Sequence, residues 1–422
     1  MDRGVIRAMV GLWLVWAVAL LAFQVVVAAR FAPERPDTVL EWTAAETGPR
    51  RHGLKPILQD QAWPGPTEWD SEFYLSIATA GYEDPLIRDH RAEDSGRPIS
   101  LNHAFMPLYP MAMRVVAAPL GVVGIPPLAA ASIAGVLVSV VSALFAMLAM
   151  ARLALDHLGR DGAIRAGWYL VLFPTGFFLA MVYTEALFLA LAFGSLTQVA
   201  DRRPLLAGIL AALATLTRPV GVALAIPLAL GLLAWWQATR SPAVQPADGE
   251  PAPAAVAARS PLDIATWLVG VALPLIAYAG WSITMGADFD ILQREFFGRA
   301  ALDLDGTFRA WGDIVEGRAT AEPRTVVYYG LELAAVVLAL VASIWAMRRW
   351  PGLALFGLVA ILVPLTSGAP QSLVRYVLAV PAIFLLLAHL GRWIVFDRGW
   401  ALLSTLLLGL LLTLFTFDFW VA

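Results

Sequence analysis

Residues 5–29 read VIRAMVGLWLVWAVALLAFQVVVAA, and this stretch decides which class of fold the chain adopts. It is longer than the roughly 20 apolar residues with which an α-helix crosses a bilayer. Arg3 and Arg7 stand near its start, as basic residues do in a secretory signal peptide. Because the run is too long for the apolar core of a signal peptide and no convincing cleavage site follows it, we expect a retained membrane span.

The composition of the whole chain points the same way. Of its 422 residues, 59% are hydrophobic and 14% charged, and the mean hydropathy is +0.72. Soluble domains carry about 25% charged residues, so a water-soluble enzyme of this size is excluded. The net charge of −3 gives no basic field for nucleic acid, and the absence of cysteine excludes disulfides, thiolate metal sites and cysteine nucleophiles. Lys55 is the only lysine beside many arginines, which we interpret as the bias of a GC-rich, bacterial genome.

Apolar runs of similar character recur along the chain. They lie near residues 126–152, 164–182, 185–200, 204–217, 219–237, 264–284, 326–347, 352–366, 373–391 and 400–418. Together with the first run they predict an all-α polytopic membrane protein, one domain over residues 1–422, with about eleven transmembrane helices. Two long polar segments, 30–105 and 285–325, interrupt the pattern. Segment 238–262 is rich in Pro and Ala without hydrophobic periodicity, and we interpret it as a flexible linker.

The arginines of the short loops predict the orientation. If the N-terminus is cytoplasmic and the runs alternate, the cytoplasmic turns hold Arg152, Arg160, Arg165, Arg202, Arg203, Arg240, Arg259, Arg348, Arg349, Arg392 and Arg398. The short outer turns hold only Arg218 and Arg375. This is the positive-inside pattern. It predicts that the two long polar segments and the C-terminus lie outside the cell and that the linker lies inside.

The first polar segment carries the strongest candidate for a catalytic acid. Residues 69–82 read WDSEFYLSIATAGY, which predicts a short amphipathic helix on the outer leaflet that ends at Gly81. Asp70 and Glu72 fall in its first turn, where Asp70 would point into a cavity of the bundle. Ionisable groups this close to lipid are costly and are site candidates by default. The alternative is that Asp70 only caps the helix.

Further candidates lie at the same outer side. His103, in the proline-broken run 102–110 (NHAFMPLYP), either binds substrate or a metal or is only hydrogen-bonded within the protein. Glu185 stands in a very short outer turn without a charged neighbour in sequence. Arg218 and Arg375 are retained on the outer side, which favours binding of an anion such as phosphate. Ion pairs with Glu185 or Asp70 are the alternative. No nucleotide-binding or hydrolase motif occurs in a suitable context.

Several blocks, taken in order, resemble one family. They are Trp69-Asp70 with Tyr74, Ile77-Ala78 and Gly81-Tyr82; AFMPLYP at 104–110; FPTGFF at 173–178 with YTEALF at 183–188; TRPVG at 217–221; and Arg375-Tyr376. This order resembles the PIG-V-type (GPI mannosyltransferase-like) mannosyltransferases of the GT-C superfamily, and the first two blocks are the most specific. Glu68, Met106 and Val220 depart from the pattern, at positions where an arginine, a phenylalanine and a small polar residue are common.

The resemblance implies a GT-C-type helical bundle that transfers mannose from polyprenyl-phosphate-mannose to an acceptor hydroxyl on the extracytoplasmic face, with inversion. We assign Asp70 as the general base, and Arg218 and Arg375 as cations that offset charge on the leaving phosphate. The expected substrate-binding residues are Glu72, Tyr74, His103, Tyr109, Glu185, Arg218, Arg375 and Tyr376. A divalent metal held by Asp70, His103 and Glu185 is left open.

Other functions also remain open. A lipid or sugar transporter or flippase would spread charges through the membrane midplane, whereas the apolar runs are nearly free of charge. Another GT-C transferase with a different lipid-linked sugar fits the same residues, and a noncatalytic scaffold would leave the clustered charges without a purpose. The acceptor is a glycolipid, a cell-wall glycan or a secreted protein. The expected location is a bacterial plasma membrane, with membrane lipids and no nucleic acid as partners.

Overall fold

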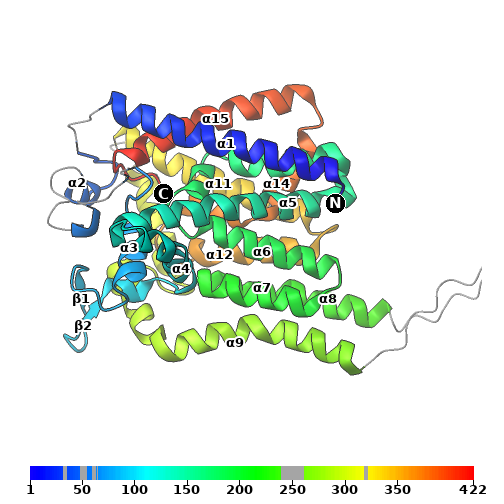
Figure 1. Cartoon of the computed structure of the whole chain (residues 1–422), viewed down its shortest axis with the longest axis horizontal. Coiled ribbons are helices and arrows are strands. Elements are labelled where there is room, and N and C mark those ends of the chain that lie inside the picture. Colours follow the sequence, from blue (N-terminus) through cyan, green and yellow to red (C-terminus); the bar gives the residue numbers. More distant parts are fainter. Residues whose placement is uncertain (32–35, 48–54, 59–62, 64, 239–260, 318–321) are drawn as a thin grey trace, which may run out of the picture.

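The computed structural model is a bundle of long α-helices that run roughly side by side, with the connecting segments gathered at the two ends (Figure 1). It describes residues 1–31, 36–47, 55–58, 63, 65–238, 261–317 and 322–422. The linker expected at 238–262 therefore lies outside the described residues over 239–260, as do parts of the first polar segment.

Helices make up almost all of the regular structure. The longer ones are α1 (Arg3–Arg30), α4 (Leu108–Val122), α5 (Pro127–Leu172), α6 (Glu185–Ala200), α7 (Pro204–Thr217), α8 (Ala225–Ala238), α9 (Pro261–Ile291), α10 (Leu304–Gly317), α11 (Pro323–Ala346), α12 (Pro351–Leu365), α14 (Pro381–Leu390) and α15 (Ile394–Thr416). The shorter elements are α2 (Thr43–Glu46), η2 (Pro56–Leu58), α3 (Ser71–Thr79), η3 (Leu101–Ala104), η4 (Gly176–Ala180), η5 (Pro219–Leu224), the π-helix η6 (Leu292–Phe296), α13 (Leu373–Tyr376) and η7 (Val377–Ala379). An antiparallel hairpin pairs β1 (Asp89–Arg91) with β2 (Pro98–Ser100) in the register Asp89 to Ser100.

Several helices are suited to a membrane by their length and composition. Six described stretches are long and apolar enough to cross one: Arg3–Arg30, Pro127–Leu172, Pro219–Ala238, Pro261–Phe296, Pro323–Ala346 and Ile394–Thr416. Leu373–Ala379 and Pro381–Leu390, bent by 81°, form a further span if they are one broken helix. α6, α7 and α12 follow expected runs but are shorter. The all-α, multi-pass membrane architecture is thus confirmed, while the number of about eleven spans stays a prediction.

α5 differs from the two separate runs expected at 126–152 and 164–182. It is one element of 46 residues that is broken at Gly159, whose φ of 66° lies outside the helical range. Its second stretch ends at Leu172 because Pro174 disfavours a helical conformation just before it. Gly176 then packs so tightly that a Cβ there would lie 2.4 Å from the Val171 carbonyl oxygen. The expected run therefore continues as η4 and not as a spanning helix.

The outside of the bundle is apolar in places where a soluble protein would be polar. In α1, Val15 and Val26 are 62% and 63% exposed, whereas Trp16 and Leu20 are buried against the protein. Exposed side chains of this kind are stable where the surrounding solvent is lipid. α1 therefore has one protein-facing side and one lipid-facing side.

α7 and α9 pack so closely that the backbone of one helix lies directly against the backbone of the other. A Cβ on Gly208 of α7 would lie 2.5 Å from the Cα of Gly270 in α9, and a Cβ on Gly270 would lie 2.5 Å from the Pro204 carbonyl oxygen. Small residues allow this approach, as they do in helix pairs within membranes. The contact fixes α9, whose C-terminal end leads into the second polar segment.

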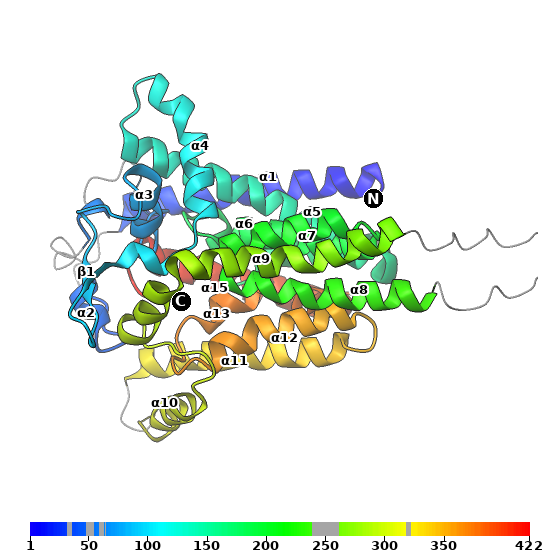
Figure 2. The same ribbon diagram turned by 90° about the horizontal axis from the view of Figure 1, so that it is seen from below.

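The candidate site lies at the end of the bundle that holds α2, α3, the hairpin and the C-terminus, opposite the N-terminus (Figure 1). Figure 2 shows α10 at the side of this end. All residues from Ser71 to Ala78 of α3 are buried, because η2, η3, α4 and α5 pack against that helix. The expectation that one face of α3 lies at the membrane interface is therefore wrong. Gly81, with a φ of 102°, does follow the helix end as expected.

Candidate active site

Asp70 occupies the N-cap position of α3, but its side chain makes no capping hydrogen bond. Its Oδ2 instead accepts a hydrogen bond of 2.9 Å from Nη1 of Arg375. The Arg375 side chain is 8% exposed and that of Asp70 is 21% exposed. The structure therefore shows the Asp70 side chain in an ion pair and not as a cap of α3. The ion pair of Arg375 with Asp70, which the sequence analysis gave as an alternative to anion binding, is thus present.

The backbone just before Asp70 is strained. Trp69 has a φ of 54°, a left-handed conformation that costs a bulky residue on the order of 1–2 kcal/mol. The Tyr183 hydroxyl holds this turn, because it accepts the Asp70 N–H at 3.2 Å and donates to the Glu68 carbonyl oxygen at 3.1 Å. The turn that carries Asp70 is thereby fixed to the segment between η4 and α6.

Glu185, the first residue of α6, lies between two arginines. Its Oε1 accepts a hydrogen bond of 2.5 Å from Nη1 of Arg218 and lies 3.4 Å from Nε of Arg375. The Glu185 residue is 2% exposed, and its Oε2 has no hydrogen-bond partner within the described part of the chain. Arg218 and Arg375 are thus both ion-paired with carboxylates. A buried acceptor without a partner is uncommon, and Oε2 is free to accept from a ligand.

Arg375 is positioned by α13, a single turn inside the broken helix pair. α13 begins after Ser372, which has a φ of 68°. The Glu332 carboxylate of α11 accepts the N–H groups of Ser372 at 2.8 Å and Val374 at 2.6 Å, and so caps this turn. Sequence reasoning missed Glu332, although an acid within the apolar run 326–347 is itself a signal. The apolar runs are therefore less free of charge than the sequence analysis held.

Three guanidinium groups surround the ring of Tyr376. Their Cζ atoms lie 4.9 Å (Arg218), 5.4 Å (Arg299) and 5.6 Å (Arg375) from the ring centroid, which is within the range of cation–π attraction. Arg299 comes from the second polar segment, where many acids and arginines mix, so no sequence feature set it apart. The arrangement concentrates positive charge beside the two carboxylates of the site.

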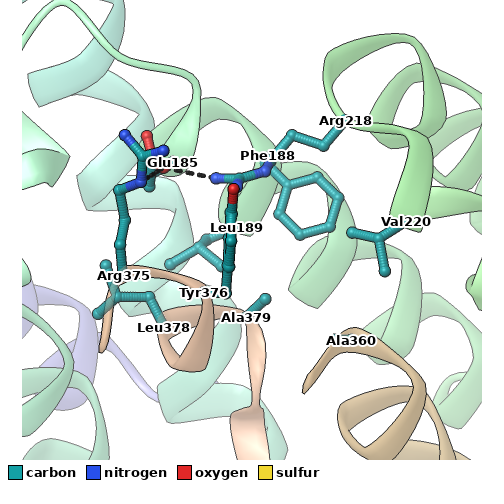
Figure 3. Close-up of a pocket in the computed structure, with 10 residues that line it drawn as sticks. All are labelled: Glu185, Phe188, Leu189, Arg218, Val220, Ala360, Arg375, Tyr376, Leu378 and Ala379. Atoms are coloured by element: carbon teal, nitrogen blue, oxygen red, sulfur yellow. Dashed lines mark hydrogen bonds and ion pairs between the residues drawn. The ribbon is translucent and has the colours of Figure 1, made fainter. Parts of the chain in front are cut away.

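A small, partly open cavity lies next to this cluster (Figure 3). Its polar lining consists of Glu185, Arg218, Arg375 and Tyr376. Its apolar lining consists of Phe188, Leu189, Val220, Ala360, Leu378 and Ala379. Figure 3 shows the charged groups together on one side of the cavity and most of the apolar side chains on the other. The cavity therefore offers charge and hydrocarbon contact at once, which suits an amphipathic ligand.

Two tyrosines expected to bind substrate do not line this cavity. Tyr109 is fully buried, and its hydroxyl lies 3.1 Å from the Gly135 carbonyl oxygen and 2.9 Å from the Ser139 hydroxyl. Tyr74 packs edge-on against the rings of Tyr109 and Tyr183, with centroid distances of 5.3 and 6.3 Å. We interpret both residues as packing that supports the turns of the site.

Glu72 belongs to a second buried polar group beside the turn of Asp70. It is 3% exposed, and within the described residues its Oε2 has no hydrogen-bond partner. Burial raises the pKa of its carboxyl to about 8, while the charges of Lys55 and Arg88 oppose the rise. The Lys55 ammonium is itself buried and lies 3.6 Å from the ring centroid of Trp69. Glu72 does not line the cavity.

His103 makes its contacts with other acids than those of the site. Its Nδ1 lies 2.8 Å from Asp288 and its Nε2 lies 2.9 Å from Glu83. Among the described residues no group of three or more His, Cys, Asp or Glu side chains could hold a metal ion. Asp70 and Glu185 are each paired with arginine, whose charge opposes a cation at the same oxygens. The residues left open as metal ligands therefore do not fit a metal site.

The fold resembles solved structures of the oligosaccharyltransferase of Archaeoglobus fulgidus. One is a crystal structure with Zn and sulfate, at 14% identity and a TM-score of 0.45 over 97% of this chain and 53% of that one. Another is AglB with an inhibitory peptide and a dolichol-phosphate, at 14% identity and a TM-score of 0.40 over 96% of this chain and 56% of that one. This chain thus spans about half the length of the solved chains. At these TM-scores the likeness supports no conclusion about activity.

The sequence itself matches one family. Residues 52–233 match the model of the family described as Mannosyltransferase (PIG-V). This segment contains Asp70, Glu185 and Arg218, while Arg299 and Arg375 lie beyond it. Comparison with curated proteins found no match. Residues 52–233, which make up less than half of the chain, are thus similar to the mannosyltransferase (PIG-V) family, and the apolar helices are those of a multi-pass membrane protein.

Proposed function

We propose that this protein transfers mannose from polyprenyl-phosphate-mannose to an acceptor hydroxyl on the extracytoplasmic face of a bacterial plasma membrane. The observation that carries the proposal is the pair of Asp70 and Arg375 beside an amphipathic cavity. The pair brings a partly exposed carboxylate and a cation together. A glycosyl transfer requires one such group for each of its two reactants. The carboxylate serves the acceptor hydroxyl, and the cations serve the leaving phosphate.

The cavity supports a donor that is a lipid-linked sugar. Its charged side fits a phosphate, for which guanidinium groups have suitable fork geometry. Its apolar side, with Phe188 and Val220, fits the first carbons of a prenyl chain. A donor of this kind needs no nucleotide-binding fold. The arginine pattern of the short loops supports the extracytoplasmic side.

In the proposed reaction the acceptor oxygen attacks the anomeric carbon of mannose opposite the phosphate. The acceptor proton passes to Asp70, which keeps 21% exposure beside its contact with Arg375. The bond between the anomeric carbon and the phosphate oxygen breaks, and polyprenyl phosphate leaves with the electron pair. The arginines offset the negative charge that grows on this phosphate, and Oε2 of Glu185 is placed to accept a sugar hydroxyl.

A transporter or flippase of the same lipid-linked sugar is the alternative from another class. It would use ionisable groups inside the spans to bind and release its cargo. Glu332 is such a group, yet both of its oxygens cap α13 and are occupied by backbone N–H groups. No observation in the described structure favours this alternative. A transferase with a different sugar shares the geometry and is separated only by the identity of the labelled product.

The substitution Asp70→Asn tests the proposal. Purified full-length protein is incubated with labelled polyprenyl-phosphate-mannose and total membrane lipids, and the labelled product is identified. We expect turnover to fall at least about a hundredfold, since a positioned general base contributes that much, while the donor still binds. Asp94→Asn, an exposed acid of the first polar segment, is the control and retains activity. Near-normal turnover by Asp70→Asn would show that Asp70 is not the base.

A further inference from the structure

The arginines around Tyr376 differ in the charges that face them. Arg375 is paired with Asp70, and Arg218 is paired with Glu185. Arg299 has no carboxylate within ion-pair distance in the described part of the chain, and its bonded partners are neutral. One positive charge of the cluster is therefore left over, and Arg299 carries it.

Arg299 is nevertheless fixed in place. Its Nη1 donates to the Ser367 hydroxyl at 3.1 Å and its Nη2 donates to the Gln371 carbonyl oxygen at 2.7 Å. The N–H of Ala300 also donates to the Ser367 carbonyl oxygen at 2.9 Å. These bonds join the second polar segment to the loop that leads into α13. A guanidinium has five N–H donors, so donors remain for a ligand.

The charge of Arg299 also acts on a carboxylate with which it makes no ion pair, that of Glu332. The two oxygens of Glu332 accept the N–H groups at the start of α13. Arg299 is also partly exposed, whereas Arg375 is buried. A partly exposed, rigidly held cation that makes no ion pair with the described residues is a favourable contact for an anion that arrives from outside.

We propose that Arg299 sets the affinity for the bound donor phosphate, and that Arg375 and Arg218 position the carboxylates of Asp70 and Glu185 and act on the phosphate mainly as it leaves. This division of roles rests on the proposed function. It changes the expectation from the sequence, in which Arg218 and Arg375 alone contact the phosphate. It also predicts that affinity and turnover depend on different arginines of the same cluster.

The experiment measures binding of a polyprenyl monophosphate and of the uncharged polyprenol of the same length to the purified full-length protein in detergent. The wild-type protein should prefer the phosphate. Arg299→Gln should lose about tenfold to a hundredfold of this preference, as expected for one charge-assisted contact, and Arg299→Lys should retain part of it. Arg294→Gln is the matched control, because Arg294 is exposed and lies in the same segment.

Steady-state transfer gives the second readout. Arg299→Gln should raise the KM for the donor with a smaller change in kcat, whereas Arg375→Gln should lower kcat. If Arg299→Gln keeps the phosphate preference of the wild type, the assignment of Arg299 is overturned, and the same holds if it lowers kcat with an unchanged KM. If the wild type itself shows no preference for phosphate over polyprenol, the proposed donor is wrong and not merely the role of Arg299. Should Arg299→Gln fail to fold, Arg299→Lys decides. If raised salt weakens the phosphate preference of the wild type but Arg299→Lys leaves that preference unchanged, the assignment is also overturned.

Discussion

Asp70 stands at the N-cap position of α3, but its carboxylate contacts Arg375 and does not cap the helix. It begins α3 at the point where aspartate commonly caps a helix. Its carboxylate turns instead to Arg375, which comes from the far end of the sequence. The strained φ of Trp69 and the clamp by Tyr183 keep this orientation. Backbone strain of this size persists only where the surroundings hold it, and it is frequent at functional sites.

The raised pKa of Glu72 predicts how the stability of the protein depends on pH. Burial raises its pKa from 4.5 to about 8, so the folded protein keeps this proton while the unfolded chain loses it. Stability should therefore fall as the pH rises from about 4.5 to about 8 and should level off above that range. The size is on the order of a few kcal/mol, since each pKa unit is worth about 1.4 kcal/mol.

The measurement compares thermal unfolding of wild type and Glu72→Gln in detergent across this pH range. The glutamine variant should show a flatter pH dependence and a higher midpoint than the wild type above pH 8. Glu316→Gln, an exposed acid in α10, is the control and should follow the wild type. Parallel curves for wild type and Glu72→Gln would contradict the raised pKa.

At the level of elements, the contact between α7 and α9 gives the sharpest prediction. A Cβ on Gly208 would collide with the backbone of Gly270, so Gly208→Ala must push the helices apart. We expect a loss of about 1–3 kcal/mol, as for other overpacked positions, seen as a lower Tm in detergent. Gly280→Ala in α9 meets no atom within 4 Å and is the matched control. Equal midpoints for the two variants would mean that this contact does not hold α9.

The elements that carry Asp70 and Arg375 are each held in place by another, distant segment. Arg375 reaches Asp70 because α13 begins at Ser372, and this turn is capped by Glu332 from α11. Asp70 itself is held from the segment before α6 by Tyr183. The two partners of the ion pair thus come from segments that are far apart in sequence, and each is fixed by a further element.

At the scale of the whole molecule, the sequence could predict the apolar solvent of the fold and four members of the charged cluster, Asp70, Glu185, Arg218 and Arg375. Apolar runs and arginine counts depend on local composition, and the blocks around Asp70, Glu185, Arg218 and Arg375 are local patterns. What it could not predict depends on contacts between distant segments. Arg299 stands among other charges of a polar loop, and only its approach to Tyr376 sets it apart. The engagement of His103 by Asp288 likewise requires the position of α9.

The absence of cysteine makes a direct test of the orientation of the whole molecule possible. Asp94, exposed in the first polar segment, lies at the end with the site. Asp156, whose side chain is 62% exposed, lies near Arg160, which contacts the opposite, N-terminal end at Gly4. In intact cells a membrane-impermeant maleimide should label Asp94→Cys, and it should label Asp156→Cys only after permeabilisation. The reverse pattern would place the arginine cluster in the cytoplasm and would contradict transfer to an extracytoplasmic acceptor.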